Sequence, residues 1–471
     1  MSSSCASKCH GGPGYASPQD AMKGPRENVL FVTAPHASDG LDAVFAVDVN
    51  PKSENYCRVI SRVDTLHVGD EVHHTGWNAC SSCHDKPSEK RSHLVVPCLN
   101  SDRIYIINVE DEKNIFLQTT IDPSSLHKLN LSFPHTSHCL ADGNIMISTL
   151  GTSSDQPSGN FLLLDGRTFQ PKGTWPADGK TVPFNYDFWY QPRQNVMIST
   201  EWGSPNHIKE GFNPQDVANG LYGNSIHVFE WNTKKHKQSI ELPLPLGALP
   251  LEVRFLHEPT KKDAFVGCAL GSSIFWIHPD LNNSDTWKAT MVAEIPSKKV
   301  SGWALAEMPA LITDIIISMD DRFLYVSCWL HGDIRQYDIS DPANPKLSSQ
   351  IYIGGSIHSE SNVVVEDEDW SLPALYVQGR RIEGGPQMLQ LSLDGQRLYV
   401  TTSLYKKWDE QFYPNNVKKG AAMLQIDVDP TSGKMTLNSD FLIDFGIIPG
   451  GPYLAHEMRY PGGDCTSDIW I

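Results

Sequence analysis

A strand, a tight turn rich in aspartate and a second strand recur along this chain, and this repeat restricts its fold more than any other feature. The two best copies, residues 318–326 and 392–400, read SMDDRFLYV and SLDGQRLYV. Apolar residues that alternate on either side of such a turn are typical of β-hairpins. Weaker copies occur at residues 100–106, 141–147, 193–198 and 261–266, and a strand expected at 43–49 supplies a seventh unit. Long amphipathic helices are not evident.

Seven such units predict an all-β fold, a seven-bladed β-propeller with long inter-strand loops. Spread over the 471 residues, the units average about 67 residues each, enough for four strands and long loops in every blade. Their spacing is irregular, so a pair of β-sandwiches, or an α+β protein with incidental hairpins, stays an alternative. We expect a single β-propeller domain over residues 26–471. A segment rich in Gly, Pro and Ser, residues 1–25, should precede it as a flexible or wrapping terminus, and residues 360–381 should form a solvated loop.

The composition excludes some classes of protein. With 40% hydrophobic and 20% charged residues the chain can bury a large core, which excludes wholesale disorder. Its 55 acidic and 38 basic residues give a net charge of −17, which disfavours nucleic acid as a partner. No segment has the apolar run of a secretory signal peptide or of a transmembrane helix, so we expect a soluble, intracellular protein. In that compartment its ten cysteines should be thiols, ligands or redox groups rather than a disulfide framework.

Seven histidines at expected loop positions form the candidate set of metal ligands. In a propeller, functional side chains come from several blades and meet at the central channel, so they are scattered in the sequence. Taken singly, each histidine is better explained as a hydrogen-bonded structural residue, but as a set they can meet around one ion. An imidazole-rich set with nearby thiols suits copper, zinc or iron rather than magnesium or calcium, and copper if redox chemistry occurs. The set comprises His73, His74, His135, His138, His257, His331 and His456.

The pair Cys80 and Cys83 is a second candidate site. A C-x-x-C pair binds a metal or forms a reversible disulfide, and ordinary packed thiols are the alternative. A four-thiolate zinc site needs a second pair, for which Cys5 and Cys9 are distant candidates. The chain has no G-x-S-x-G, G-x-G-x-x-G or G-x-x-x-x-G-K-[ST] motif, which disfavours hydrolase and nucleotide-dependent functions.

The chain resembles the selenium-binding protein and methanethiol oxidase family over essentially its whole length. Many long motifs in one order carry the resemblance, and they end with the tail RYPGGDCTSDIWI at residues 459–471. The others include KGPRE at 23–27, HHTGWN at 73–78, CSSC at 80–83, HTSHC at 135–139, YDFWYQP at 186–192, STEW at 199–202, WLHGD at 329–333 and GGPQM at 384–388.

The resemblance implies a β-propeller that oxidises methanethiol with O₂ and water to formaldehyde, hydrogen sulfide and hydrogen peroxide, with copper as cofactor. It also implies covalent binding of selenium, which would fall on Cys57. Together with Cys57, the thiols of Cys80 and Cys83 are the expected cofactor-binding cysteines. A carboxylate such as Glu201 or Asp333 would accept a proton. The family is cytosolic and nuclear, with peripheral membrane association and a role in transport within the Golgi.

Two functions compete with the enzyme. In one, the propeller is a non-enzymatic scaffold whose Cys57 carries selenium or senses electrophiles, with Arg58 as the one adjacent cation. In the other, Cys80 and Cys83 form a thiol–disulfide sensor. His84 directly follows Cys83, departs from the pattern of the family and adds a further candidate ligand to this pair.

Overall fold

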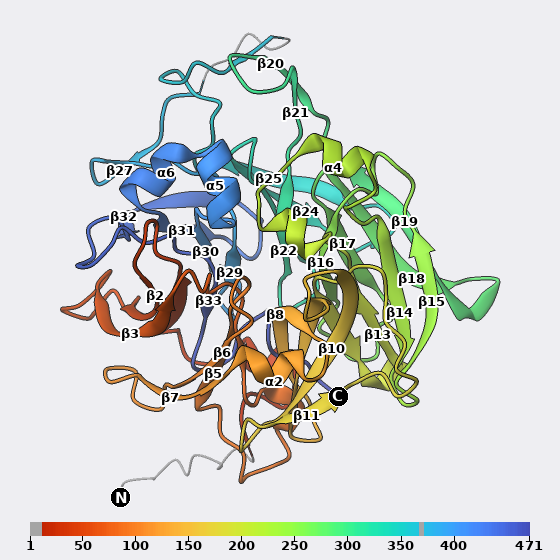
Figure 1. Ribbon diagram of the computed structural model, residues 1–471. Helices are drawn as coiled ribbons and strands as arrows, with labels where there is room; N and C mark the ends of the chain where they lie inside the picture. Colours follow the sequence, from red (N-terminus) through yellow and green to blue (C-terminus); the bar gives the residue numbers. More distant parts are fainter. Residues whose placement is uncertain (1–11, 367–371) are drawn as a thin grey trace, which may run out of the picture.

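The seven repeated units form seven blades around a common axis. The computed structural model describes residues 12–366 and 372–471. These residues contain seven four-stranded antiparallel sheets, one three-stranded sheet and one two-stranded sheet. The seven large sheets are arranged around a common axis (Figure 1), so the chain is a seven-bladed β-propeller, as the repeat predicts.

Each blade runs from an innermost strand at the axis to an outermost strand at the rim. The second blade comprises β4 (Gly76–Trp77), β5 (His93–Pro97), β6 (Ile104–Asn108) and β7 (Phe116–Ile121). The third comprises β8 (Ser132–Cys139), β9 (Asn144–Gly151), β10 (Pro157–Asp165) and β11 (Pro171–Thr174). The fourth comprises β12 (Phe188–Gln191), β13 (Val196–Ser199), β14 (Ser225–Glu230) and β15 (Lys235–Glu241).

The remaining blades repeat this order. The fifth comprises β16 (Pro250–Phe255), β17 (Ala264–Cys268), β18 (Ser273–Asp280) and β19 (Asn283–Glu294). The sixth comprises β22 (Ile312–Ile317), β23 (Phe323–Cys328), β24 (Asp333–Asp338) and β25 (Lys346–Tyr352). The seventh comprises β29 (Leu389–Leu391), β30 (Arg397–Thr401), β31 (Ala422–Val428) and β32 (Met435–Asp444). Inner strands such as β8 and β16 are buried along their whole length, whereas the rim strand β15 alternates between exposed and half-buried residues.

The sequence repeat marks the turn between the first and second strands in five blades, and in the second blade it marks the turn between β5 and β6. Residues 318–322 join β22 to β23, and residues 392–396 join β29 to β30. Asp321 (φ 60°) and Gly395 (φ 72°) adopt the left-handed conformation in these turns. Glycine, and less readily aspartate, enter that region at low conformational energy, which explains the Asp-rich turn of the repeat.

Both ends of the chain build the first blade and so close the ring. This blade comprises β1 (Val29–Ala34), β2 (Leu41–Asp48), β3 (Val59–Val68) and, from the far end of the chain, β33 (Met458–Arg459). The innermost strand β33 pairs antiparallel with β1, Phe31 opposite Arg459. Within the segment expected to be flexible or wrapping, residues 12–25 pack on the domain through α1 (Pro18–Ala21), and the Trp470 indole donates to the Tyr15 carbonyl (3.0 Å).

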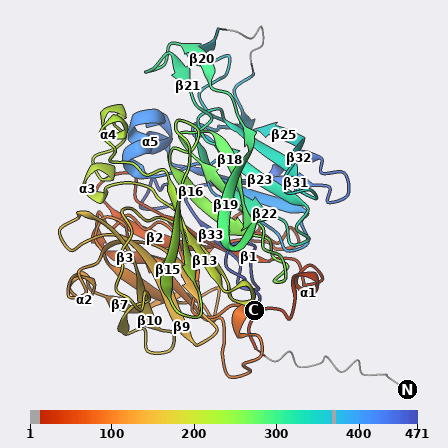
Figure 2. The same ribbon diagram turned by 90° about the vertical axis from the view of Figure 1, so that its right-hand side faces the viewer.

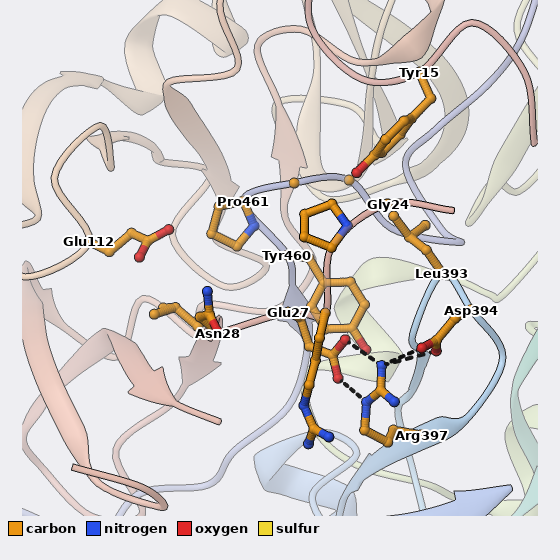
Figure 3. A pocket seen from close by; sticks show the side chains of 15 residues that line it. Tyr15, Gly24, Glu27, Asn28, Glu112, Leu393, Asp394, Arg397, Tyr460 and Pro461 are labelled. Carbon is orange, nitrogen blue, oxygen red and sulfur yellow. Dashed lines mark hydrogen bonds and ion pairs between the residues drawn. The ribbon is translucent and has the colours of Figure 1, made fainter. Parts of the chain in front are cut away.

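A cavity of about 150 Å³ lies at this closure (Figure 3). It lies where residues 24–29 meet residues 460–463 and the turn between β29 and β30. Arg397 binds both Glu27 (2.5 Å) and Asp394 (2.9 Å) in its wall, and the Tyr399 hydroxyl donates to Glu27 (2.8 Å). The seven histidines proposed as ligands do not line this cavity, which therefore belongs to the ring closure rather than to a metal site.

Hydrophobic clusters fill the space between neighbouring blades, and a further cluster rich in Trp and Tyr lies at one end of the propeller. That end carries α3 (Pro205–Ile208), α4 (Pro214–Ala218) and α5 (Lys406–Phe412), whereas α1 and the C-terminus lie on the opposite face (Figure 2). The remaining helical segments are α2 (Pro123–His127), α6 (Pro414–Lys419) and the 3₁₀ turns η1 (Ser81–Cys83) and η2 (Pro192–Gln194).

Two small sheets decorate the ring. The strands β20 (Lys298–Ser301), β21 (Glu307–Met308) and β26 (Val364–Val365) project from the body, and β27 (Tyr376–Val377) pairs with β28 (Arg380–Arg381) (Figure 1). The strands β26, β27 and β28 lie within the loop expected at residues 360–381. Residues 367–371 of that loop lie outside the described part of the chain. No helix among the described residues is long and apolar enough to cross a membrane.

Candidate metal centre

Four of the seven candidate histidines meet near the axis of the propeller. His73 and His74 precede β4, His135 lies in β8, and His456 precedes β33, so three neighbouring blades contribute. The ring of His73 lies 3.7 Å from that of His456 and 4.9 Å from that of His74, measured between centroids. The His135 ring lies 4.1 Å from that of His74. One ring nitrogen from each of His73, His74 and His135 lies within 4.8 Å of the others, close enough to share one ion.

Five ring nitrogens in this cluster have no hydrogen-bond partner. They are both nitrogens of His73 and the Nε2 atoms of His74, His135 and His456. All four side chains are at most 2% exposed. A buried polar atom without a partner destabilises a protein by about 1–3 kcal/mol, so several at one point indicate a missing ligand. The cluster therefore fits a metal ion, which would accept the free lone pairs.

The opposite nitrogens of two of these rings are held by the protein. His456 Nδ1 donates to the Ser403 carbonyl (2.9 Å), which leaves Nε2 as the lone pair directed into the cluster. His135 Nδ1 lies 2.9 Å from the Thr136 hydroxyl. Such contacts fix the tautomer and the orientation of a ligating imidazole.

Burial keeps the four rings neutral. It lowers the pKa of His135 to about 3 and that of His456 to about 4, and the pKa values of His73 and His74 fall well below the usual range. For His73 and His74 the neighbouring imidazoles add to the effect of desolvation. Neutral imidazole is the form that binds metals, so the cluster can accept an ion without releasing protons from these rings.

Two buried carboxylates accompany the cluster. Glu457 Oε1 lies 3.6 Å from His74 Nδ1, and Glu252 Oε1 lies 3.9 Å from His74 Nε2. Burial raises the pKa of Glu457 to about 7 and that of Glu252 well above its usual range. Arg459 pairs with Glu457 (2.6 Å). Glu252 and Asp187 flank Arg254, at 2.6 and 2.5 Å.

Neither carboxylate was chosen from the sequence. Glu457 directly follows the candidate ligand His456, and that adjacency is the signal that could have found it. Glu252 lies in the apolar strand β16, where no local pattern marks it, and only the closure of the ring brings it to His74. Tyr186 was likewise missed as a site residue; its ring packs on His135 with centroids 4.0 Å apart.

The other three histidines have different surroundings. The ring of His138 contacts Phe188 and Trp189, at 5.1 and 5.2 Å between centroids. Nε2 of His257 lies 3.0 Å from the Ile317 carbonyl, and Nε2 of His331 lies 3.0 Å from the Met308 carbonyl. His257 and His331 thus have the hydrogen bonds of structural histidines.

The two carboxylates chosen from the sequence as proton acceptors lie in other networks. Glu201 pairs with His227 (2.9 Å) and accepts from the amide of Ser225 (2.8 Å). Asp333 pairs with Arg335 (2.9 Å) and accepts from the Gln350 amide (2.6 Å). These contacts hold strands within blades four and six, and they give neither carboxylate a contact with the histidine cluster.

The cysteines differ from the expected arrangement. Cys80 forms a disulfide with Cys139, 59 residues away, rather than with Cys83, whose thiol is free and buried. Cys57 lies in the turn between β2 and β3, at the rim of the first blade. Burial raises the pKa values of both Cys57 and Cys83, so neither is a preformed thiolate. Cys5 and Cys9 lie outside the described residues.

Comparison with known proteins gives consistent results. The family model described as 56kDa selenium binding protein (SBP56) matches residues 9–471. A rat protein named methanethiol oxidase is 53% identical over 479 residues, covering 100% of both chains. The human methanethiol oxidase is 53% identical over 475 residues, which cover 99% of this chain and 100% of the human one.

The fold has a close counterpart among solved structures. The X-ray structure of a hypothetical selenium-binding protein from Sulfolobus tokodaii is 35% identical, with a TM-score of 0.85. The superposition covers 97% of this chain and 98% of the other.

Proposed function

The chain belongs to the 56 kDa selenium-binding protein family, and on that basis we propose that it is a methanethiol oxidase. The reaction is CH₃SH + O₂ + H₂O → HCHO + H₂S + H₂O₂. The observation that carries the proposal is the cluster of four buried, neutral histidines with five unpartnered nitrogens at the axis. His73, His74, His135 and His456 would hold a copper ion. Copper fits this imidazole set and, unlike zinc, can exchange electrons.

Bound copper would supply a soft acceptor for the thiolate sulfur and a centre for electron exchange. The chain itself supplies orientation, since the bonds from His456 to Ser403 and from His135 to Thr136 fix two rings. Trp202, Tyr405 and Tyr186 pack around the cluster and exclude water from it. This exclusion strengthens every charge interaction inside the site.

We assign proton transfer to the two carboxylates beside His74, those of Glu457 and Glu252. Oxidation of methanethiol to the level of thioformaldehyde releases two electrons and two protons, and O₂ takes both pairs to become hydrogen peroxide. Water then converts the carbon to formaldehyde and releases hydrogen sulfide. Glu457, with a pKa of about 7, is suited to accept the thiol proton near neutral pH, because a general base works best when its pKa is near the working pH. Glu252 lies on the opposite side of the His74 ring.

The experiment measures copper content and hydrogen sulfide release on the same preparations. His74→Ala, His135→Ala and His456→Ala should each lose copper and turnover. His331→Ala should keep both, because His331 bonds to the Met308 carbonyl rather than to the cluster. Full copper and full activity in all three cluster variants would refute the proposed site.

A second function, selenium binding at Cys57, is favoured by one observation. Among the described free cysteines, Cys57 alone is not buried. Its backbone is in the left-handed region (φ 61°), and its sulfur lies 3.9 Å from the Asp440 carbonyl. We propose that selenium is carried there, apart from the histidine cluster. The cytosolic and nuclear location, the peripheral membrane association and the role in Golgi transport implied by the resemblance stay predictions.

A further inference from the structure

Three cysteine sulfurs meet at one buried point away from the histidines. Cys80 precedes η1, Cys83 ends it, and Cys139 ends β8. The Ser82 hydroxyl oxygen lies 3.2 Å from the sulfur of Cys80, 3.8 Å from that of Cys139 and 3.9 Å from that of Cys83. The three side chains are at most 2% exposed. Two segments far apart in the sequence thus place three sulfurs within 3.9 Å of a single atom.

This arrangement is held by contacts from both ends of the chain. The Ser81 amide donates to Asp468 (2.8 Å), and the Tyr15 amide donates to the Ser81 hydroxyl (3.1 Å). Asp468 is fixed in turn by Arg91 (2.5 Å). Inside the turn, the Cys83 amide donates to the Cys80 carbonyl (2.9 Å). The positions of the sulfurs are therefore set by the closure of the ring, which is the preorganisation that a ligand site requires.

We propose that Cys80, Cys83 and Cys139 form a second metal site, which binds Cu(I) when the three thiols are reduced and is closed by the Cys80–Cys139 disulfide. Three thiolates each about 2.3 Å from one ion lie about 4 Å from each other. The three sulfurs lie within 3.9 Å of the Ser82 hydroxyl oxygen. Reduction frees the sulfurs of Cys80 and Cys139, which the disulfide holds at bonding distance, to separate to about 4 Å. Rotation of the Ser82 side chain then leaves the space between the three sulfurs to the ion. Soft thiolates select Cu(I), which accepts three ligands, whereas structural zinc takes four.

Cys83 adds a third sulfur beside the disulfide pair, 3.9 Å from the Ser82 hydroxyl oxygen, and its thiol is free. A metal ion displaces the thiol proton as it binds. His84 follows directly, and its Nδ1 is buried without a hydrogen-bond partner.

Reduction of the Cys80–Cys139 disulfide needs a reductant, and we propose a low-molecular-weight thiol for this role. Two molecules of that thiol each give one electron and one proton to the disulfide and become a disulfide themselves, leaving Cys80 and Cys139 as free thiols. Cu(I) then displaces three protons and forms three Cu–S bonds. No electron moves in this second step, so the copper stays Cu(I).

The new site is separate from the histidine centre. His135 and Cys139 lie four residues apart on β8 and have different neighbours: His135 packs on His73, His74 and Tyr186, whereas Cys139 lies beside Cys80 and Ser82. The first site offers imidazole nitrogens, and the second offers sulfurs. The two can therefore be distinguished both by stoichiometry and by ligand type, whatever the outcome for the oxidase activity.

The test is an anaerobic titration with Cu(I), supplied as its acetonitrile complex, against the chelator bathocuproine disulfonate. Reduced wild-type protein should retain one copper per chain more than the disulfide form. Copper X-ray absorption should assign sulfur ligands to the additional ion, a measurement that needs no variant. Equal copper in the two redox states, or an additional ion without sulfur ligands, would overturn the proposal.

Variants locate the site. Cys83→Ser and Cys139→Ser should lose the additional copper, while Cys98→Ser should retain it, because Cys98 is a buried free thiol whose sulfur donates to the Val96 carbonyl (3.9 Å). The melting temperature of each variant shows that it is folded. Retention of the additional copper by folded Cys83→Ser would refute the site. Displacement of Cu(I) by an equal amount of Zn(II) would refute the choice of metal.

Discussion

Removing the metal from the histidine centre should destabilise the whole propeller by a measurable amount. Without an ion, five ring nitrogens of His73, His74, His135 and His456 are buried without a partner. A ligand that binds only the folded state stabilises it by about 4 kcal/mol when its free concentration is 1,000 times its dissociation constant. An unfolding entropy of about 2.1 cal/mol/K per residue gives about 1 kcal/mol per kelvin for 471 residues. The midpoint of thermal unfolding should therefore fall by about 4 °C.

The assay is differential scanning calorimetry at pH 7.5 on protein treated with a copper chelator and on the same protein reloaded with copper. The reloaded sample should regain the 4 °C. In His135→Ala the two curves should coincide, because a ligand is missing from the cluster, while His331→Ala should show the full difference. Equal midpoints for chelated and reloaded wild-type protein, or an undiminished difference in His135→Ala, would refute the reasoning.

Three further predictions concern titration, ring closure and the exposed thiol. Below pH 6.5 the free energy of unfolding of the metal-free protein should decrease. Histidines of the unfolded chain take up protons in this range, whereas folded His135, with a pKa of about 3, does not. The decrease is about 2 kcal/mol per such histidine at pH 5. His135→Gln should remove that much of the decrease between pH 7 and pH 5 in urea titrations, and an unchanged slope would contradict the burial argument. Arg397→Met removes the ion pair of the Glu27 carboxylate at the ring closure. It should lower the free energy of unfolding by about 3 kcal/mol and the midpoint of thermal unfolding by about 3 °C. The control Arg58→Met, at an exposed position, should change the free energy of unfolding by less than about 0.5 kcal/mol. Cys57→Ser should abolish selenium incorporation and leave methanethiol turnover intact; loss of both would place the two functions at one site.

The fold was predictable because its signal is local and repeated. In the two clearest copies, the turn between the first two strands of the blade contains a residue in the left-handed region, Asp321 or Gly395. Alternating apolar residues then define the strands on either side. The closure was not predictable, because the pairing of β1 with β33 joins Phe31 to Arg459, and two-residue strands carry no periodic pattern.

The site was predictable only in part, for the same physical reason. Four of the seven histidines meet, but sequence position does not tell which blade ends face the axis at the same height. His331 was chosen as a candidate ligand together with His135, yet its Nε2 lies 3.0 Å from the Met308 carbonyl. Glu252 is hidden in an apolar strand, and its role follows from ring geometry alone. The disulfide of Cys80 also depends on a distant strand end, that of Cys139, rather than on the nearby C-x-x-C spacing.

The central claim is that the four axial histidines hold the copper at which methanethiol is oxidised. Pulsed electron paramagnetic resonance of the disulfide form, loaded with one equivalent of Cu(II), tests it most directly. The spectrum should show couplings to imidazole nitrogens from several histidines, which should be lost in His74→Ala and His456→Ala and retained in His331→Ala. Anaerobic methanethiol should also alter this signal in the wild-type protein. A spectrum without imidazole couplings, or one that the two cluster variants leave unchanged, would contradict the account.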